Sequence, residues 1–143
     1  MFYQTSLLGS DLINIPSKDY SIINSEKQSL VKFPPQSRSI VLFWASWCGP
    51  CKIEMARLRS SVESGKIKPI QIFAINPFET LVDIKKFVST NNYPFTFLDA
   101  ADIGFDLSIS STPTTLFLEG EKIISRSSGM SLLGIWKAEK YLR

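Results

Sequence analysis

Two cysteines separated by two residues constrain this chain more than any other feature of its sequence. They are Cys48 and Cys51, the only cysteines among 143 residues, and Gly49 and Pro50 stand between them. A continuous run of β-branched and aromatic residues, Ser39–Ala45, precedes the pair and is typical of a central strand buried on both faces. After the pair, apolar residues recur at helical spacings of three and four. The sequence therefore predicts a dithiol between a buried strand and a helix.

Composition narrows the chemistry that this dithiol can perform. The chain has no histidine, which excludes histidine-based catalytic triads, histidine metal sites and histidine pH switches. Two cysteines without histidine cannot supply the four ligands of a usual zinc site. A disulfide framework for a small secreted fold would need more than one short bridge. We therefore expect no metal and no cofactor, and a pair of thiols that opens and closes.

The start of a helix is a place where a cysteine becomes reactive. Pro50 suits the first turn, where its missing N–H costs no hydrogen bond. Free N–H groups and the partial positive charge of the helix N-terminus favour a thiolate on Cys48 and lower its pKa. We expect a solvent-reachable Cys48 to attack a substrate disulfide and Cys51 to resolve the mixed disulfide. The alternative is an inert structural disulfide, but a bridge that closes so short a loop would stabilise the fold poorly.

The rest of the chain alternates strand and helix patterns. Thr80 is expected to cap a helix that runs to Thr90, and a turn at Glu119–Gly120 is expected to join two antiparallel strands. Alternating elements imply right-handed crossovers and parallel strands, so we expect an α/β fold whose central mixed sheet carries helices on both faces. The other expected strands are Pro69–Ile75, Phe95–Leu98, Thr115–Leu118 and Lys122–Ser127; a short helix is expected over Ala101–Leu107, and a last helix, capped by Ser131, is lined by Leu132, Leu133, Trp136 and Leu142.

The first 38 residues are polar and irregular. Short apolar alternations around Leu12–Ile15 and Tyr20–Ile23 predict a small N-terminal β-hairpin or edge strands. No linker and no internal repeat divides the chain. We therefore expect a single domain over 1–143, with an N-terminal extension over 1–38 and the core over 39–143.

The segment FWASWCGPCK, Phe43–Lys52, resembles the active-site segment of the thioredoxin superfamily. Residues Ser111–Thr115 resemble the loop that in this superfamily holds a cis-proline opposite the cysteines, and Gly129 matches its glycine before the last helix. The resemblance implies a thioredoxin fold and a cis peptide bond at Pro113, with the Thr112 backbone free to pair with an incoming peptide strand. The alternative is an ordinary proline at the beginning of a strand.

One branch of the superfamily, the TlpA/ResA/CcmG-type thiol–disulfide oxidoreductases, resembles this chain further. Glu54 lies six residues after Cys48, where that branch places a glutamate beside the cysteines. The stretches Tyr93–Asp99 and Phe105–Leu107 and the N-terminal hairpin segment also resemble it. The resemblance implies an extracytoplasmic protein, with a signal or an anchor, that reduces protein disulfides, often for cytochrome c maturation.

The chain departs from these patterns at three places. Leu42 stands where ordinary thioredoxins have a buried aspartate, so Glu54 is the nearby candidate for proton transfer. Ala56 replaces a proline that often follows this glutamate in the branch, and Gly49–Pro50 is the dipeptide of thioredoxin. Glu54 is either a half-buried carboxylate with a raised pKa or a surface residue that pairs with Arg57.

The net charge and the hydropathy of the chain indicate which partners and which cellular compartment to expect. The net charge is +3 and no concentrated basic face is visible, so we expect no nucleic acid partner. The longest apolar run, Ile40–Ala45, is far shorter than the roughly 18 residues of a membrane-spanning helix. Residues 1–15 contain no lysine or arginine and their apolar residues are interrupted, unlike a secretory signal. Two possibilities stay open, a cytoplasmic protein or a chain whose signal or anchor has been removed.

These observations predict a monomeric protein-disulfide reductase. Its partners would be disulfide-containing protein substrates and an upstream protein thiol donor. We expect catalysis to depend on Cys48, Cys51, Glu54 and Pro113. We expect the substrate to contact Trp47, Gly49, Pro50 and Thr112, although Trp47 is alternatively a loop aromatic without a function. A non-catalytic binding module and a disulfide oxidase are the alternative functions.

Overall fold

A mixed β-sheet forms the centre of the protein. The computed structural model describes residues 14–23, 29–130 and 134–143, and the structural statements below concern these residues. The sheet has the strand order β6-β5-β4-β7-β8, with β4 parallel to β5, β5 parallel to β6, and antiparallel pairs at β4–β7 and β7–β8. Its strands are β4 (Arg38–Phe43), β5 (Ile72–Ile75), β6 (Thr96–Leu98), β7 (Thr114–Glu119) and β8 (Lys122–Ser128).

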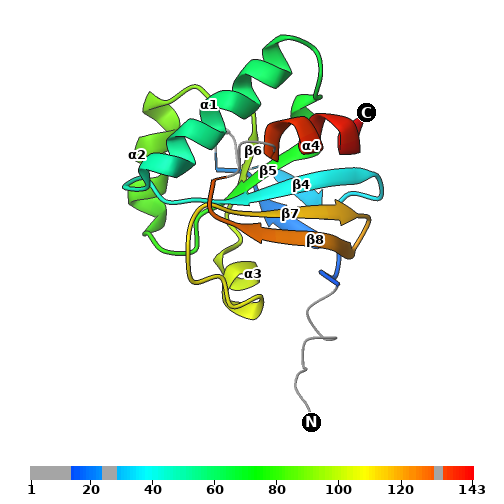
Figure 1. Ribbon diagram of the computed structural model, residues 1–143. Coiled ribbons are helices and arrows are strands. Elements are labelled where there is room, and N and C mark those ends of the chain that lie inside the picture. The colour runs from blue at the N-terminus through cyan, green and yellow to red at the C-terminus, as the bar shows by residue number, and fades with distance from the viewer. Residues whose placement is uncertain (1–13, 24–28, 131–133) are drawn as a thin grey trace.

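Helices cover both faces of this sheet, as predicted. In Figure 1, α1 and α4 lie above the strands, α2 lies at their left, and α3 lies below them. Successive side chains of β4 point to opposite faces. Ile40 and Leu42 pack in the core beneath α1, α2 and α4, whereas Val41 and Phe43 pack in the core that includes α3. The helices are α1 (Gly49–Glu63), α2 (Leu81–Thr90), α3 (Ala101–Asp106) and α4 (Gly134–Leu142).

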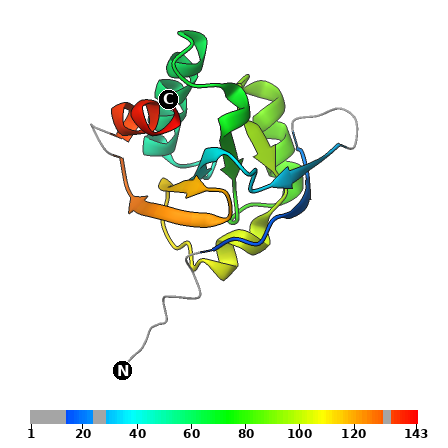
Figure 2. The ribbon, with the colours of Figure 1, turned by 90° about the vertical axis from the view of Figure 1, so that its right-hand side faces the viewer.

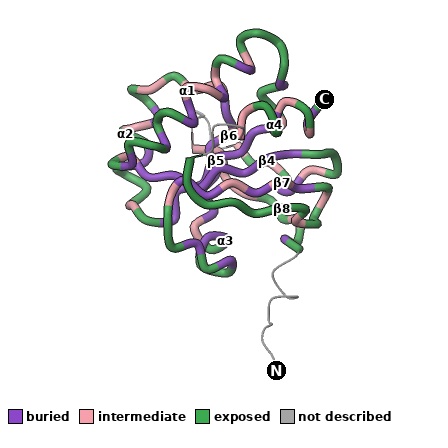
Figure 3. Tube along the Cα trace, in the orientation of Figure 1, coloured by how far each residue is buried: buried purple, intermediate pink, exposed green. Residues whose placement is uncertain are grey.

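The central strand is therefore buried on both sides, which confirms the interpretation of the apolar run before the cysteines. Every residue from Ser39 to Ala45 is at most 1% exposed. Figure 3 shows the buried trace running along the middle strands, while β8 at the edge is largely exposed. Because β4 is enclosed on both faces, the position at which the following loop begins is fixed.

An N-terminal hairpin closes the lower face of the sheet. Its strands, β2 (Lys18–Ser21) and β3 (Leu30–Phe33), pair antiparallel. The Ile15 N–H donates to Glu121 O at 2.7 Å near β8, and the Ile23 N–H donates to Phe97 O at 2.8 Å on β6. The N-terminal segment thus crosses the face from one edge to the other (Figure 2).

The hairpin was expected, but its strands differ from the expected alternations. Ile15 and Asn14 lie outside the strands, although Asn14 forms an isolated bridge with Lys122, and Leu12 lies outside the described residues. The second strand, β3, was not predicted. A cis peptide bond at Phe33–Pro34 follows it.

Several element boundaries also differ from those expected. Pro69–Gln71 form a 3₁₀ helix, η2, before β5. Proline has no N–H for a ladder and its fixed φ suits a helical turn, so the strand begins only at Ile72. Thr80 caps α2 as predicted, with its Oγ1 accepting the Asp83 N–H at 3.3 Å.

The prediction for the residues that line the last helix is confirmed only in part. Leu142 is buried, but Trp136 is 55% exposed and lies under the Lys140 ammonium, 5.1 Å from the ring centroid. Its expected packing role is therefore wrong, because it lies on the outer face of α4. Ser131, Leu132 and Leu133 lie outside the described residues.

Candidate active site

Cys48 and Cys51 lie at the start of α1 and form a disulfide. Cys48 is the N-cap residue, with φ −90° and ψ 106°, and its Cα lies 5.2 Å from that of Cys51. The Cys51 N–H donates to the Cys48 sulfur at 3.1 Å. The first turn of α1 holds no acidic residue. The N-terminal N–H groups of the helix and its dipole therefore act on the Cys48 sulfur with no carboxylate in that turn to oppose them.

The exposure of the pair corrects one expectation. Cys48 is only 5% exposed and Cys51 is fully buried, so Cys48 is not the open thiol that was expected. Its sulfur is bonded to the fully buried Cys51, and Cys48 packs in the core beneath α1, α2 and α4. The surface around it is formed instead by Trp47, which is 68% exposed, and by the exposed Gly49 and Pro50. Of the two cysteines, Cys48 alone keeps some access to solvent.

Pro113 lies at the same end of the sheet as this turn. Thr112–Pro113 is a cis peptide bond, in agreement with the resemblance. The next residue, Thr114, pairs with Phe43, the last residue of β4, so the two loops leave neighbouring strand ends. The Gly129 N–H donates to Pro113 O at 2.7 Å, and φ of Gly129 is +83°, a conformation that glycine adopts readily. Pro113 is buried and Thr112 is half-buried.

Arg126 holds the chain that leads into the Pro113 loop, and the sequence analysis missed it. From β8 its Nη1 donates to Leu107 O at 2.6 Å and its Nη2 to Ser108 O at 3.3 Å. Ser108 has a φ of +53°. An arginine on an edge strand carries no sequence signal for such a contact, because its partners are carbonyl groups and not side chains.

Glu54 is a buried carboxylate that also pairs with Arg57. It is 6% exposed, so the surface interpretation is wrong, yet Arg57 Nη1 lies 3.5 Å from its Oε1, as the spacing of three predicts. Cys51 and Glu54 are also three residues apart on α1, which places them on one face. Glu54 lines a cavity of about 300 Å³ between α1, α4, β7 and β8, with Leu58 and Phe117 among its other walls.

Two departures from the family patterns have structural counterparts. Leu42 is 1% exposed and packs in the core beneath α1, α2 and α4, so an apolar side chain occupies the position of the thioredoxin aspartate. Helix α1 runs from Gly49 to Glu63 through the half-buried Ala56. Glu54 is accordingly the carboxylate that α1 places on the cysteine face.

A second group of polar residues, also missed, joins the turn before Cys48 to the loop after β5. Glu79 Oε1 accepts the Ser46 N–H at 2.6 Å and Asn76 Nδ2 at 2.7 Å, and its Oε2 accepts the Ser46 hydroxyl at 2.5 Å. Burial alone would raise the pKa of Glu79, but the hydrogen bonds from Ser46 and Asn76 outweigh it and lower that pKa. The available signal was weak, because the sequence indicated only that a strand ends at Ile75.

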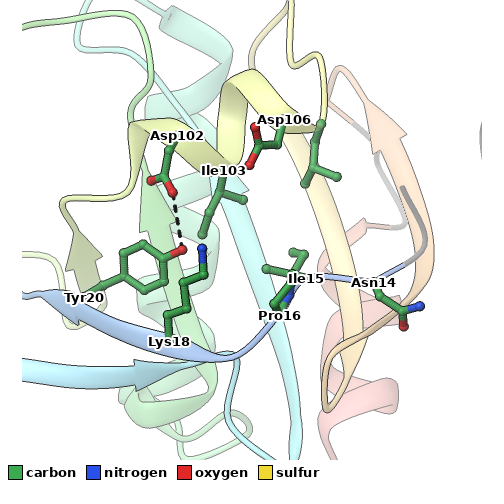
Figure 4. A pocket seen from close by; sticks show the side chains of 9 residues that line it. Asn14, Ile15, Pro16, Lys18, Tyr20, Asp102, Ile103 and Asp106 are labelled. Atoms are coloured by element: carbon green, nitrogen blue, oxygen red, sulfur yellow. Dashed lines mark hydrogen bonds between the residues drawn. The ribbon is translucent and has the colours of Figure 1, made fainter. Parts of the chain in front are cut away.

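Another cavity lies on the opposite side of the molecule. It measures about 270 Å³ and is enclosed by the N-terminal segment and α3, where the Tyr20 hydroxyl donates to Asp102 Oδ2 at 3.5 Å (Figure 4). Burial and the nearby Asp102 charge raise the pKa of Tyr20. No residue predicted for the dithiol site lines this cavity, which is therefore separate from it.

The described residues hold neither a membrane-spanning helix nor a cluster of metal ligands. None of the helices in 14–23, 29–130 and 134–143 has the length and apolar character needed to traverse a bilayer. Over the same ranges, histidine, cysteine, aspartate and glutamate do not gather in threes or more in a way that would hold a metal ion.

Known proteins resemble this chain in sequence and in fold. The model of the AhpC/TSA family matches residues 14–126. The thiol:disulfide interchange protein HelX of Rhodobacter capsulatus is 31% identical over 94 residues, 63% of this chain and 51% of that protein. The thiol-disulfide oxidoreductase ResA of Bacillus cereus is 31% identical over 101 residues, 64% of this chain and 57% of that protein. The chain thus spans little more than half the length of these relatives.

Solved structures confirm the thioredoxin fold. The exposed lipoprotein thioredoxin of Streptococcus pneumoniae superposes with a TM-score of 0.70 at 14% identity, over 89% of this chain and all of that chain. The predicted architecture, a central mixed sheet with helices on both faces and an added N-terminal strand pair, is therefore correct.

Proposed function

This chain belongs to the AhpC/TSA family, and we propose that it is a thiol–disulfide oxidoreductase that reduces disulfides in protein substrates. The observation that carries the proposal is the position of Cys48, which caps α1, accepts the Cys51 N–H and is bonded to Cys51. A sulfur there leaves and attacks readily as a thiolate, because the helix N-terminus stabilises its charge. The similarity to HelX, a thiol:disulfide interchange protein, and to ResA, a thiol-disulfide oxidoreductase, supports this chemistry over the part that they share with the chain.

The reaction begins with the reduced chain. The Cys48 thiolate attacks one sulfur of the substrate disulfide; a bond from Cys48 to that sulfur forms, and the second substrate sulfur leaves as a thiolate that takes a proton. Cys51 then loses its proton and attacks the Cys48 sulfur, which forms the Cys48–Cys51 disulfide and releases the first substrate sulfur. Two electrons pass from the dithiol to the substrate. An upstream protein dithiol returns them and restores the chain.

Glu54 is the group that we assign to proton transfer. It lies on the cysteine face of α1 and is buried, and Cys51 is itself enclosed and has no direct contact with solvent through which to lose its proton. A carboxylate beside it can take that proton when Cys51 attacks and release it when the dithiol is restored.

The substrate peptide would lie between the Trp47 turn and the Pro113 loop. Trp47, Gly49 and Pro50 form the exposed surface on one side, and the Thr112 backbone would pair with an extended segment on the other. The resemblance to extracytoplasmic reductases supports a place outside the cytoplasm, in thiol maintenance or cytochrome c maturation. The protein would act as a monomer.

Reduction of insulin by dithiothreitol tests the activity. The chain should accelerate it, Cys48→Ser should abolish the acceleration, and Cys51→Ser should accumulate the mixed disulfide. Glu63→Gln, a substitution on the exposed last turn of α1, is the matched control and should leave the rate unchanged. No acceleration by the wild type would instead favour a non-catalytic binding module.

The direction of exchange needs a separate experiment. Alkylation of thiols in intact cells, followed by fractionation, reports the redox state of the Cys48–Cys51 pair together with its compartment. A reductase is held mainly as the dithiol by its donor. A mainly oxidised pair would contradict the proposed direction and favour a disulfide oxidase.

A further inference from the structure

We propose that Glu79 is a positioning residue, which fixes the turn before Cys48 so that protein substrates meet Trp47 and the cysteine in one orientation. This inference rests on the proposed function. Glu79 lies in the loop before α2, 31 positions after Cys48 in the sequence, and would belong to the same site. The bridging residues Ser46, Asn76 and Glu79 are called the Ser46 bridge below.

The turn that Glu79 holds leads directly to the reacting sulfur. The Cys48 N–H donates to Ala45 O at 3.2 Å, so Ser46 and Trp47 are the two central residues of a closed turn. Glu79 accepts both donors of Ser46, the N–H and the hydroxyl. A two-point attachment of one residue to a carboxylate fixes its rotation as well as its place, which a single hydrogen bond would not do.

The other end of the Ser46 bridge is rigid. Asn76 is 4% exposed, its Nδ2 donates to Glu79, and its Oδ1 accepts the N–H groups of Phe78 and Glu79 at 3.0 and 3.2 Å. Asn76 directly follows β5, and the Trp44 N–H donates to Ile75 O at 3.0 Å where the chain leaves β4. Strands β4 and β5 are parallel neighbours in the sheet, and Figure 1 shows them side by side beneath α1. Buried strand ends thus anchor both loops.

An aromatic contact accompanies the polar one. The Trp47 and Phe78 rings lie 6.4 Å apart, and these side chains are 68% and 40% exposed. Phe78 belongs to the loop that Glu79 attaches to the turn. If the Ser46 bridge opens, Trp47 therefore loses its fixed neighbour, and the apolar surface next to Cys48 no longer has one shape. A protein substrate, which must align its disulfide with Cys48, is sensitive to that change.

Substitution of Glu79 by glutamine and by alanine distinguishes the effect of its hydrogen bonds to the turn from the effect of its negative charge. In Glu79→Gln, the amide oxygen can still accept the Ser46 N–H and Asn76, and the amide nitrogen can donate to the Ser46 hydroxyl. All three contacts are kept while the negative charge is lost. Glu79→Ala removes all three contacts. Asp83→Ala is the matched control: Asp83 lies in the first turn of α2, is exposed, and has no side-chain hydrogen bond with any residue that the structure describes.

The experiment compares these variants by three measurements on folded protein. Glu79→Ala should lower kcat/KM for insulin reduction by about tenfold or more, as small misplacements at a reacting centre do. Its rate of alkylation by iodoacetamide at Cys48, which demands no substrate alignment, should change less than about twofold under the same argument. Amide hydrogen exchange at Ser46 and Trp47 should be faster in Glu79→Ala. Asp83→Ala should match the wild type in all three. Glu79→Gln should match it in insulin reduction and alkylation, and its hydrogen exchange at Ser46 and Trp47 should stay slower than that of Glu79→Ala.

Each other outcome overturns the inference. Unchanged hydrogen exchange in Glu79→Ala would show that Glu79 does not hold the turn, whether or not the wild type is active, so this result is independent of the proposed function. Equal effects of alanine and glutamine would assign the effect to charge. Faster hydrogen exchange in Glu79→Ala with full insulin reduction would leave Glu79 a merely structural role. A wild type without insulin reductase activity contradicts the proposed function itself.

Discussion

Alanine in place of Gly104 should destabilise the protein, although alanine forms helices better than glycine. Gly104 is buried in α3, and a Cβ there would lie 2.6 Å from Pro77 Cβ and 2.8 Å from Pro77 Cγ. Pro77 is itself buried, and its ring cannot swing aside. Overpacking of a close-packed interior costs about 1–3 kcal/mol. Alanine regains about 1 kcal/mol of helix propensity. The expected net loss in the free energy of unfolding is therefore about 1 kcal/mol.

Urea unfolding followed by tryptophan fluorescence measures this loss, and a double-mutant cycle isolates its cause. In a Pro77→Gly background the obstructing ring atoms are gone, so Gly104→Ala should there stabilise the protein by up to about 1 kcal/mol. The sign of one substitution thus depends on its neighbour. Stabilisation by Gly104→Ala in the wild type, or the same loss in both backgrounds, would refute the packing argument.

Three further predictions concern the site. Glu54→Gln should slow insulin reduction and displace its pH profile, because Cys51 loses its proton acceptor; an unchanged rate and profile would return Glu54 to a structural role. Arg126→Leu should lower the free energy of unfolding by about 1 kcal/mol and slow exchange, since it frees the chain before the Pro113 loop; urea unfolding and the insulin assay check both effects. The hydrogen bonds that lower the pKa of Glu79 should stabilise the fold fully above about pH 4.5 and lose that contribution as pH falls through its lowered pKa; urea unfolding at pH 7, 4.5 and 3 should show the wild type losing its advantage over Glu79→Gln.

Local signals accounted for the centre of this fold. The apolar run before the cysteines, the cap at Thr80 and the turn at Gly120 each follow from the chemistry of a few neighbouring residues. The Cys48–Cys51 pair is local in the same sense, because residues three apart at a helix start lie within disulfide reach. Elements set by neighbours in sequence are those that the sequence predicts best.

Contacts between distant segments were not accessible in this way. Ser46 and Glu79 are 33 positions apart, and either residue alone is an ordinary polar loop residue. What could have linked them is topology, since the ends of adjacent parallel strands meet at one edge of a sheet. The low exposure of Cys48 was missed for a similar reason: the helix-cap position was recognised, but the packing of Cys48 in the core joins it to residues distant in sequence.

Alkylation of the reduced protein is the measurement that tests the central assignment most directly. Iodoacetamide labelling across a range of pH, with the modified cysteine identified by peptide mass spectrometry, reports which sulfur is the nucleophile. Labelling should occur first at Cys48, with a midpoint well below the value of about 8.5 for free cysteine. Equal labelling of Cys48 and Cys51, or a midpoint at that of free cysteine, would contradict an attacking thiolate at the start of α1.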